Sequence, residues 1–265
     1  MNQAALNNAQ ASDSGVIHLE TVSKDVPSPG EVLYWTYMDK GDGSSAYKTQ
    51  NDAFATFWFG IEYSVHGERR YTGFTYATAE RFGQDAKNHE PAPDDKVTIG
   101  EATFIRNASG ESKPWKFSGN DESLGETGAF DQADEFDKDG KVLFHPLHGE
   151  DFMIAVPTSS LQSGSTISNY AIFSRAKEQS KWMYLGQIYR GADNEQNCAP
   201  AGIEPCTKST GKLEFVDKGG VMPEIHVEMS GTTVSGPGKT RTLGAEDGEV
   251  YVFDSNAKKY NPTKS

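Results

Sequence analysis

The chain has 265 residues and a mass of 28.9 kDa, and its 35% hydrophobic content is typical of a globular protein with one large core or two small ones. Its 25 lysines and arginines stand against 38 aspartates and glutamates, which gives a net charge of −13. This charge repels nucleic acid and anionic lipid, so both are excluded as partners. It suits a basic protein partner, and it equally serves solubility alone. No apolar run approaches the ~20 residues of a transmembrane helix.

The first fifteen residues, MNQAALNNAQASDSG, are small and polar and lack the charged and apolar regions of a signal peptide. We interpret residues 1–15 as a flexible N-terminal tether. Such a tether fits an exported protein after loss of a signal or lipid anchor, and it also fits the ragged end of a cytosolic protein. Residues 16–265 are expected to form a single β-rich globular domain.

Short runs rich in β-branched and aromatic residues, separated by turn residues, predict strands along most of the chain. An all-β fold of antiparallel strands, sandwich-like or propeller-like and with little helix, is therefore expected. The best helix candidate is TYATAERFGQDAKNH, residues 75–89, although its first residues also carry a strand pattern. The predicted strands are 16–22, 31–37, 55–65, 69–78, 96–105, 152–156, 169–176, 181–191, 211–217, 224–230 and 249–255.

Two predicted hairpins, residues 59–78 and 171–191, resemble each other. Each has an apolar strand, a charged turn and an aromatic strand with an internal glycine, Gly73 or Gly186. They are compatible with two similar halves and equally with unrelated hairpins of an all-β chain. The acidic, glycine-containing stretch 120–140 is the candidate boundary between halves.

The only two cysteines, Cys198 and Cys206, lie in the loop NCAPAGIEPC between two predicted strands. This spacing favours one short disulfide over a zinc site, which usually needs four ligands. A disulfide would in turn favour an extracytoplasmic location, periplasmic in a bacterium. Two unpaired thiols are the alternative.

The segment GTTVSGPGKT, residues 231–240, has the Gly-Lys-Thr ending of a phosphate-binding loop. Two extra residues, Pro237 and Gly238, break the required spacing, and a further predicted strand follows where a helix is needed. We therefore interpret it as a connection between strands and assign no nucleotide function to Lys239. No cofactor is expected.

Two segments contain possible metal ligands. In FHPLHGED, His145 and His148 precede two carboxylates, but the internal proline and glycine favour a solvated turn. In EFDKDGKVLF, Glu135, Asp137 and Asp139 alternate as in a calcium loop, but Pro146 replaces the closing glutamate. A hairpin turn on Asp139 and Gly140 is the better interpretation, and no metal is assigned to either segment.

Aromatic residues make up 11% of the chain, and neighbouring aromatics on a strand must face opposite sides of a sheet. Some of Trp35, Trp58 and Tyr189 are therefore candidates for an outward patch that binds protein or sugar. Burial between two sheets is the alternative. The sequence has no G-x-S-x-G nucleophile motif, and no catalytic residue is predicted, so the chain is not expected to be an enzyme.

The strand-and-turn texture of the C-terminal third, from WMYLGQIYRG through the two cysteines to EVYVFDSNAKKY, resembles bacterial periplasmic inhibitors and immunity lipoproteins. Those proteins act against secreted toxins such as type VI effectors. The resemblance covers about ninety residues and no specific motif. It implies an exported β-rich protein, possessing or having lost a lipid anchor, that occludes a toxin.

The expected function is therefore neutralisation of a protein partner with a basic patch. Its expected contact residues are the aromatics Trp35 and Trp58 and the acids Glu135, Asp137 and Asp139. The alternative is an extracytoplasmic carbohydrate-binding or carbohydrate-processing protein that uses exposed aromatics. Fold class alone does not separate them.

Overall fold

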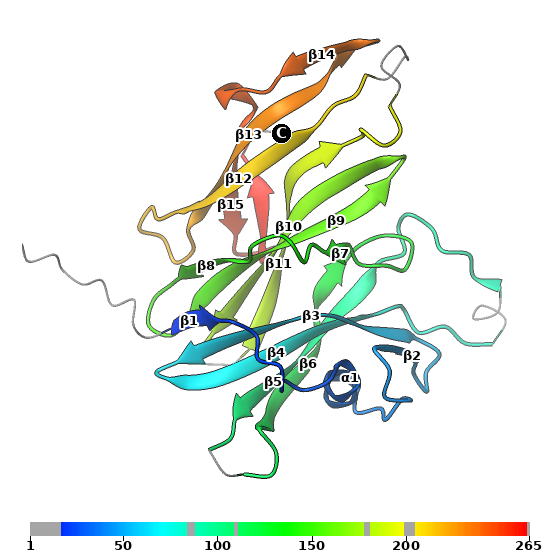
Figure 1. The fold of residues 1–265 in the computed structure, drawn as a ribbon, viewed down its shortest axis with the longest axis vertical. Coiled ribbons are helices and arrows are strands. Elements are labelled where there is room, and N and C mark those ends of the chain that lie inside the picture. Colours follow the sequence, from blue (N-terminus) through cyan, green and yellow to red (C-terminus); the bar gives the residue numbers. More distant parts are fainter. Residues whose placement is uncertain (1–16, 84–87, 109–110, 178–180, 199–204, 264–265) are drawn as a thin grey trace, which may run out of the picture.

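A computed structural model describes residues 17–83, 88–108, 111–177, 181–198 and 205–263, so the expected tether lies outside the described residues. Every strand pair is antiparallel, which confirms the predicted all-β fold (Figure 1). The elements are β1 (Ile17–Glu20), α1 (Pro29–Tyr37), β2 (Ala46–Lys48), β3 (Phe54–Val65), β4 (Glu68–Ala77), β5 (Val97–Arg106), β6 (Trp115–Thr127), β7 (Glu135–Phe136), β8 (Leu143–Pro146), β9 (Phe152–Gln162), β10 (Ser165–Ala176), β11 (Lys181–Asp193), β12 (Ser209–Val216), β13 (Glu224–Gly236), β14 (Lys239–Thr242), β15 (Glu249–Asp254) and β16 (Lys259–Pro262).

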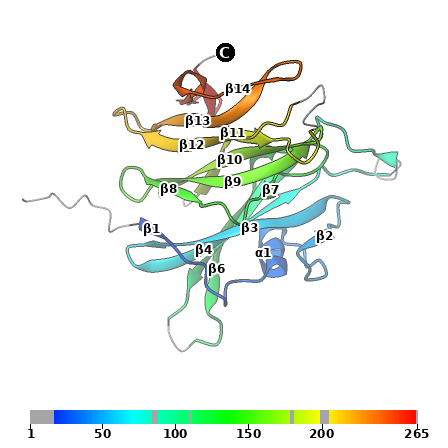
Figure 2. The same cartoon turned by 45° about the horizontal axis from the view of Figure 1, so that its top comes forward.

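Three sheets lie on top of one another, as a sandwich with one extra layer (Figure 2). The first sheet has the order β1-β3-β4-β5-β6, with β2 beside β3. The middle sheet has the order β11-β10-β9-β7, with β8 beside β9, and the third has the order β12-β13-β15-β16, with β14 beside β13. The chain passes from the first sheet to the middle sheet between Thr127 and Glu135, inside the stretch expected to hold a boundary.

The first hydrophobic core lies between the first and middle sheets. Phe59 and Phe74 from the first sheet pack against Phe173 and Trp182 from the middle sheet, with ring centroids 4.7 to 5.9 Å apart. All four side chains are almost completely buried. Because the two sheets share this core, they stabilise each other.

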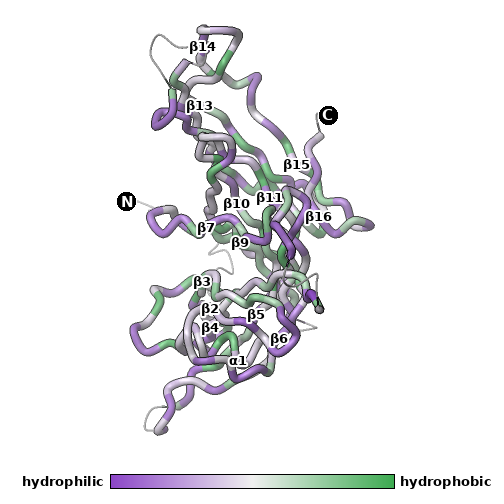
Figure 3. Tube along the Cα trace, turned by 90° about the vertical axis from the view of Figure 1, so that its right-hand side faces the viewer, coloured by the Kyte–Doolittle hydropathy of each residue, from purple (hydrophilic) through white to green (hydrophobic). Residues whose placement is uncertain are grey.

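A second core lies on the opposite face of the middle sheet. Ile172 and Leu185 point away from the first core and pack with Ile225, Val227 and other side chains of the third sheet. Strands β9 and β10 are therefore buried on both faces, and their central residues read as continuous apolar runs. Hydrophobic segments follow the stacked strands, while most projecting turns are hydrophilic (Figure 3).

Helix α1 covers the outer face of the first sheet, so the strand predicted for residues 31–37 is wrong. Ser28 caps the helix, its hydroxyl accepting the N–H of Glu31 at 3.2 Å, and Pro29 occupies the first turn. The side chain of Val32 rests over Gly73, where any Cβ would lie 2.6 Å from a Val32 methyl. The capping signal Ser-Pro-Gly-Glu was present and outweighed the aromatic content.

The predicted helix over residues 75–89 is also wrong in its first part, because Thr75–Ala77 belong to β4 and residues 78–82 form no helix. Residues 84–87 lie outside the described residues, and Asn88 beside them is helical. Strand β6 was missed because it is an edge strand of alternating exposure with few apolar residues. Its polar sequence suggested a linker instead.

The predicted turns are largely present. His66 and Gly67 join β3 to β4 with φ angles of 50° and 79°, as a two-residue hairpin with left-handed residues requires. The predicted connection over residues 231–240 is shorter than expected: only Pro237 and Gly238 join β13 to β14, and the rest of the segment belongs to the two strands. The turn at Asp139 and Gly140 exists, but it is not a hairpin, since β7 and β8 each pair with β9.

The predicted disulfide is confirmed: Cys198 and Cys206 are bonded, with their Cα atoms 5.0 Å apart. It bridges the connection between β11 and β12, part of which, residues 199–204, lies outside the described residues. Of the helices in the described part of the chain, none has the length and apolar character needed to cross a bilayer.

Candidate functional site

The two expected aromatic contacts are not both at the surface. Trp58 is only 9% exposed and lies in the first core, where its indole N–H donates to the carbonyl of Asp134 at 2.7 Å. It cannot contact a partner, so its assignment as a contact residue is corrected. Trp35 is half-buried on α1 and stacks on Phe117, with ring centroids 4.3 Å apart.

The three expected acids lie on β7 and in the turn that follows. Glu135 and Asp139 are exposed. Asp137 is half-buried, forms an ion pair with Arg190 at 3.0 Å, and accepts the N–H of Gly140 at 3.0 Å. Two of the three carboxylates therefore face solvent, while the partly exposed Asp137 also holds the turn in place.

His145 and His148 do not form a metal site with each other among the described residues. The imidazole of His145 lies 3.2 Å from the Asp217 carboxylate and stacks on Phe215, with ring centroids 5.0 Å apart. The next carboxylate, Glu150, contacts Lys177 and His66 at 2.6 and 2.8 Å. The segment is thus a turn secured by ion pairs.

A different group, His89, Asp95 and Asp131, brings three potential ligand atoms together. Arg81 already lies among them, 3.0 Å from Asp131 and 3.5 Å from Asp95. His89 is 2.9 Å from Asp131. The guanidinium supplies the positive charge that the two carboxylates need, so this group reads as a network that closes a loop.

A pocket of about 340 Å³, which we call the α1 pocket, opens at the C-terminal end of α1. Its charged lining residues in the described part of the chain are Asp39, Glu80 and Glu122, with no lysine or arginine among them. Helix α1 has no basic residue in its last turn to offset the negative end of its dipole. The lining residues are Tyr37, Met38, Asp39, Thr49, Gln50, Asn51, Ala53, Ala77, Thr78, Ala79, Glu80, Thr98 and Glu122.

Hydrogen bonds fix two of these carboxylates in the α1 pocket. Asp39 accepts the backbone N–H of Gln50 at 2.9 Å, and Glu80 accepts the amide of Asn51 at 2.7 Å. Glu122 is exposed on β6 and raises the pKa of Tyr37, after burial, which is the larger cause. The pocket is a pre-formed negative site that a cationic group would neutralise.

Two exposed apolar side chains lie in or beside the α1 pocket. Met38, in its wall, is 61% exposed, and Phe54, whose backbone is bonded to Thr78, is 49% exposed. Phe82 and Phe130 are also exposed, next to the bonded pair Arg81 and Asp131. Acidic and apolar groups therefore lie together at the α1 pocket, and exposed apolar side chains rimmed by polar groups are typical of interaction sites.

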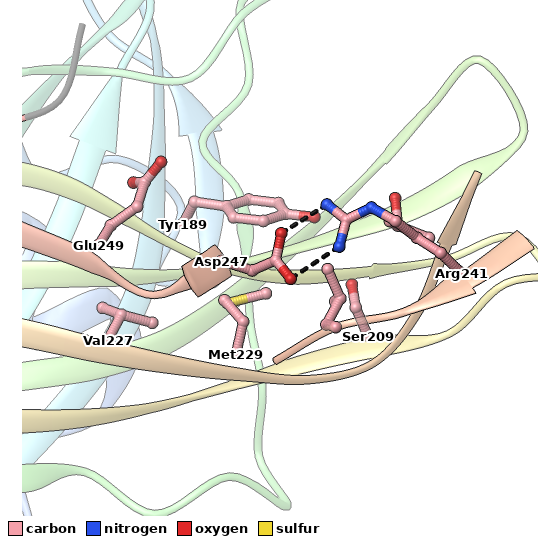
Figure 4. Close-up of a pocket in the computed structure, with 9 residues that line it drawn as sticks. Tyr189, Ser209, Val227, Met229, Arg241, Asp247 and Glu249 are labelled. Carbon is pink, nitrogen blue, oxygen red and sulfur yellow. Dashed lines mark hydrogen bonds and ion pairs between the residues drawn. The ribbon is translucent and has the colours of Figure 1, made fainter. Parts of the chain in front are cut away.

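A second pocket, of about 150 Å³, lies against the third sheet, and we call it the third-sheet pocket (Figure 4). The ring of Tyr189, which is 40% exposed, lies beside an ion pair between Arg241 and Asp247. The pair is bidentate, at 2.7 and 2.5 Å. Val227 and Met229 form an apolar part of the wall.

Neither pocket was predicted from sequence, although both left partial signals. Tyr189 was a candidate outward aromatic, and the structure places it on the edge of the middle sheet with an exposed ring. Glu122 lies in the acidic stretch that suggested a boundary. The other pocket residues come from separate strands, so only the fold brings them together.

Comparison with known proteins adds no assignment. No protein-family model matches the chain, no curated protein matches its sequence, and no solved structure matches its fold.

Proposed function

We propose that this chain is an extracytoplasmic binding protein that neutralises a basic protein partner by covering it, as an immunity protein covers a secreted antibacterial toxin. The observation that carries the proposal is the α1 pocket, whose lining has three carboxylates and no lysine or arginine. The proposal assigns no catalytic step to the chain.

The α1 pocket suits the side chain of a lysine or arginine. Either cation would meet Asp39, Glu80 and Glu122, and its aliphatic stem would pack on exposed Met38. Because Asp39 and Glu80 are held by hydrogen bonds, little side-chain entropy is lost on binding. Such a pre-formed pocket is the usual setting for an interface hot spot.

Charge and the disulfide agree with this function. A net charge of −13 accelerates encounter with a basic surface, and exposed Glu135 and Asp139 contribute to that field. Cys198 and Cys206 form a disulfide. Disulfides persist in oxidising compartments and are rare in the reducing cytosol. The charge supports a basic partner, and the disulfide supports a partner met outside the cytosol.

The proposal is tested by affinity purification from the periplasm of the native source, followed by binding kinetics with the captured protein. We expect association to slow as salt increases, since long-range attraction is screened. Replacing Glu122→Gln should mainly speed dissociation, by about tenfold for each ~1.4 kcal/mol lost.

Glu214→Gln is the matched control, because it removes the same charge from an exposed position on β12, in the third sheet. It should leave dissociation unchanged. Association that is indifferent to salt, or equal dissociation rates for the two variants, would contradict the proposal.

A further inference from the structure

The third-sheet pocket adjoins another pocket, of about 210 Å³, and the two share Ser209 in their linings. Ser209 is the first residue of β12, and its hydroxyl is bonded to the backbone of Ala192 on β11. We call the pair the β11–β12 groove. It lies between the edge of the middle sheet and the third sheet, whereas the α1 pocket belongs to the first sheet.

Charges in the β11–β12 groove cancel. Its lining contains three cationic side chains, Arg190, Lys208 and Arg241, and three anionic ones, Asp193, Asp247 and Glu249. The chain as a whole has a net charge of −13, and the α1 pocket has three acids without a base. A balanced lining favours a ligand that is uncharged but polar.

The third-sheet pocket combines a flat ring with fixed polar groups. The Tyr189 ring presents a negative π-face, which attracts the polarised C–H groups on one face of a saturated ring. Arg241 offers N–H donors and Asp247 offers carboxylate acceptors, and their bidentate contact holds both in position. A group that both donates and accepts, such as a ring hydroxyl, matches this pair.

Size points to the same kind of ligand. A volume of about 150 Å³ accommodates one six-membered ring, since a cavity of ~150 Å³ binds benzene. Glu249 adds a further acceptor, oriented by a hydrogen bond from the Tyr251 hydroxyl. Apolar contact on one face and polar groups at the edge suit a pyranose better than an aromatic side chain.

Of the nine residues that line the second pocket of the β11–β12 groove, all but Ala192 carry a polar or charged side chain. Thr166, Ser168 and Thr210 supply hydroxyl groups, and Gln196 supplies an amide. The cation of Lys208 is fixed by Asp193 at 2.7 Å. This pocket could hydrogen-bond a second sugar residue linked to the first.

We propose that the β11–β12 groove binds a neutral oligosaccharide, with one pyranose against Tyr189 and the next in the polar pocket. This function is additional to protein binding and does not depend on it, because the two sites share no lining residue.

The test uses the whole protein and three neutral disaccharides as probes, namely maltose, cellobiose and N,N′-diacetylchitobiose. Saturation-transfer NMR at millimolar sugar should show binding of at least one probe. Tyr189→Ala should weaken that binding by about tenfold or more, which corresponds to loss of one good contact. Tyr189→Phe, which keeps the aromatic ring, should retain sugar binding.

Tyr34→Ala is the matched control, because Tyr34 is an exposed tyrosine on α1, in a different layer. It should leave sugar binding intact. No binding of any probe, binding unaffected by Tyr189→Ala, or tighter binding of digalacturonic acid than of the neutral probes would overturn the proposal. Binding of a capped tetra-alanine peptide that is lost in Tyr189→Ala would also overturn it.

Discussion

The indole N–H of Trp182 on β11 donates a hydrogen bond to the hydroxyl of Thr72 on β4, at 3.2 Å, across the interface between the first and middle sheets. Trp182 is 2% exposed and Thr72 is fully buried. The same hydroxyl lies 2.8 Å from that of Thr103, so the bond continues into a buried polar chain. The two sheets are thus joined by a specific contact as well as by apolar packing.

We predict that Trp182→Ala destabilises the protein by about 3–5 kcal/mol, since it leaves a large cavity and removes the donor to Thr72. Trp182→Phe should cost less, because the phenyl ring refills part of the space. Urea unfolding followed by circular dichroism measures both. If Trp182→Ala lowers the free energy of unfolding no more than the exposed control Tyr34→Ala does, Trp182 does not join the sheets.

The next prediction concerns Glu101, which is 3% exposed and accepts a hydrogen bond from Thr103 at 2.7 Å. Burial is the main cause that raises the pKa of Glu101 to about 8, from its ordinary value of 4.5; the hydrogen bond from Thr103 and the charge of Arg175 oppose the rise, and nearby Asp121 adds to it. Between these pH values the folded state binds more protons than the unfolded state. Stability should therefore fall as pH rises through this window, by at most ~1.4 kcal/mol per pH unit, and level off above it.

Glu101→Gln keeps an acceptor for Thr103 but cannot ionise, so its unfolding free energy should lack this contribution. The measurement is the difference between the parent and Glu101→Gln in urea unfolding from about pH 5 to about pH 9. Glu126→Gln is the control, because it makes the same substitution at an exposed glutamate on β6. Parallel pH profiles for the parent and Glu101→Gln would contradict the raised pKa.

A third prediction uses Gly73 on β4, which lies directly under Val32 of α1. Gly73→Ala should destabilise the protein by about 1–3 kcal/mol, because the added methyl would force the helix off the sheet. Gly119→Ala on β6 is the matched control, since a Cβ there meets nothing within 4 Å. Equal melting temperatures for the two variants would show that α1 does not pack closely over Gly73.

The disulfide gives the fourth prediction. A cross-link that spans eight residues of sequence separation should contribute about 2–3 kcal/mol by restricting the unfolded chain. The double variant Cys198→Ser, Cys206→Ser should lose that amount in urea unfolding. Unfolded, unreduced parent protein should react with no thiol reagent, and labelling of both cysteines would rule out the bond and with it the main support for export.

Much of the fold could be predicted because burial leaves a local pattern. Strands β3, β4, β9 and β10 were predicted from short runs rich in β-branched and aromatic residues, and the structure buries most of those runs. Helix α1 was missed because its aromatic residues fit a strand pattern, although the four-residue capping signal was present, and β6 was missed because edge strands need few apolar side chains.

The candidate sites were less predictable, for a different physical reason. Glu122 on β6 lines the same pocket as Asp39 and Glu80 only because the fold brings β6 and the end of α1 to one place. Arg241 and Tyr189 meet only because the third sheet folds over the edge of β11. Trp58 was predicted as a contact residue but is buried. The sequence pattern of its strand did not distinguish the buried face from the exposed one.

The middle sheet has a consequence for how the protein opens. Ile172 and Phe173 are consecutive, yet they belong to separate cores, so exposing the backbone between them requires both neighbouring layers to detach. Amide hydrogens of β9 and β10 should therefore exchange with deuterated solvent only through global unfolding, while those of β14 exchange through local opening. In kinetic terms the central strands open as a single cooperative unit, whereas parts of the outer layers can open locally while the central strands stay folded.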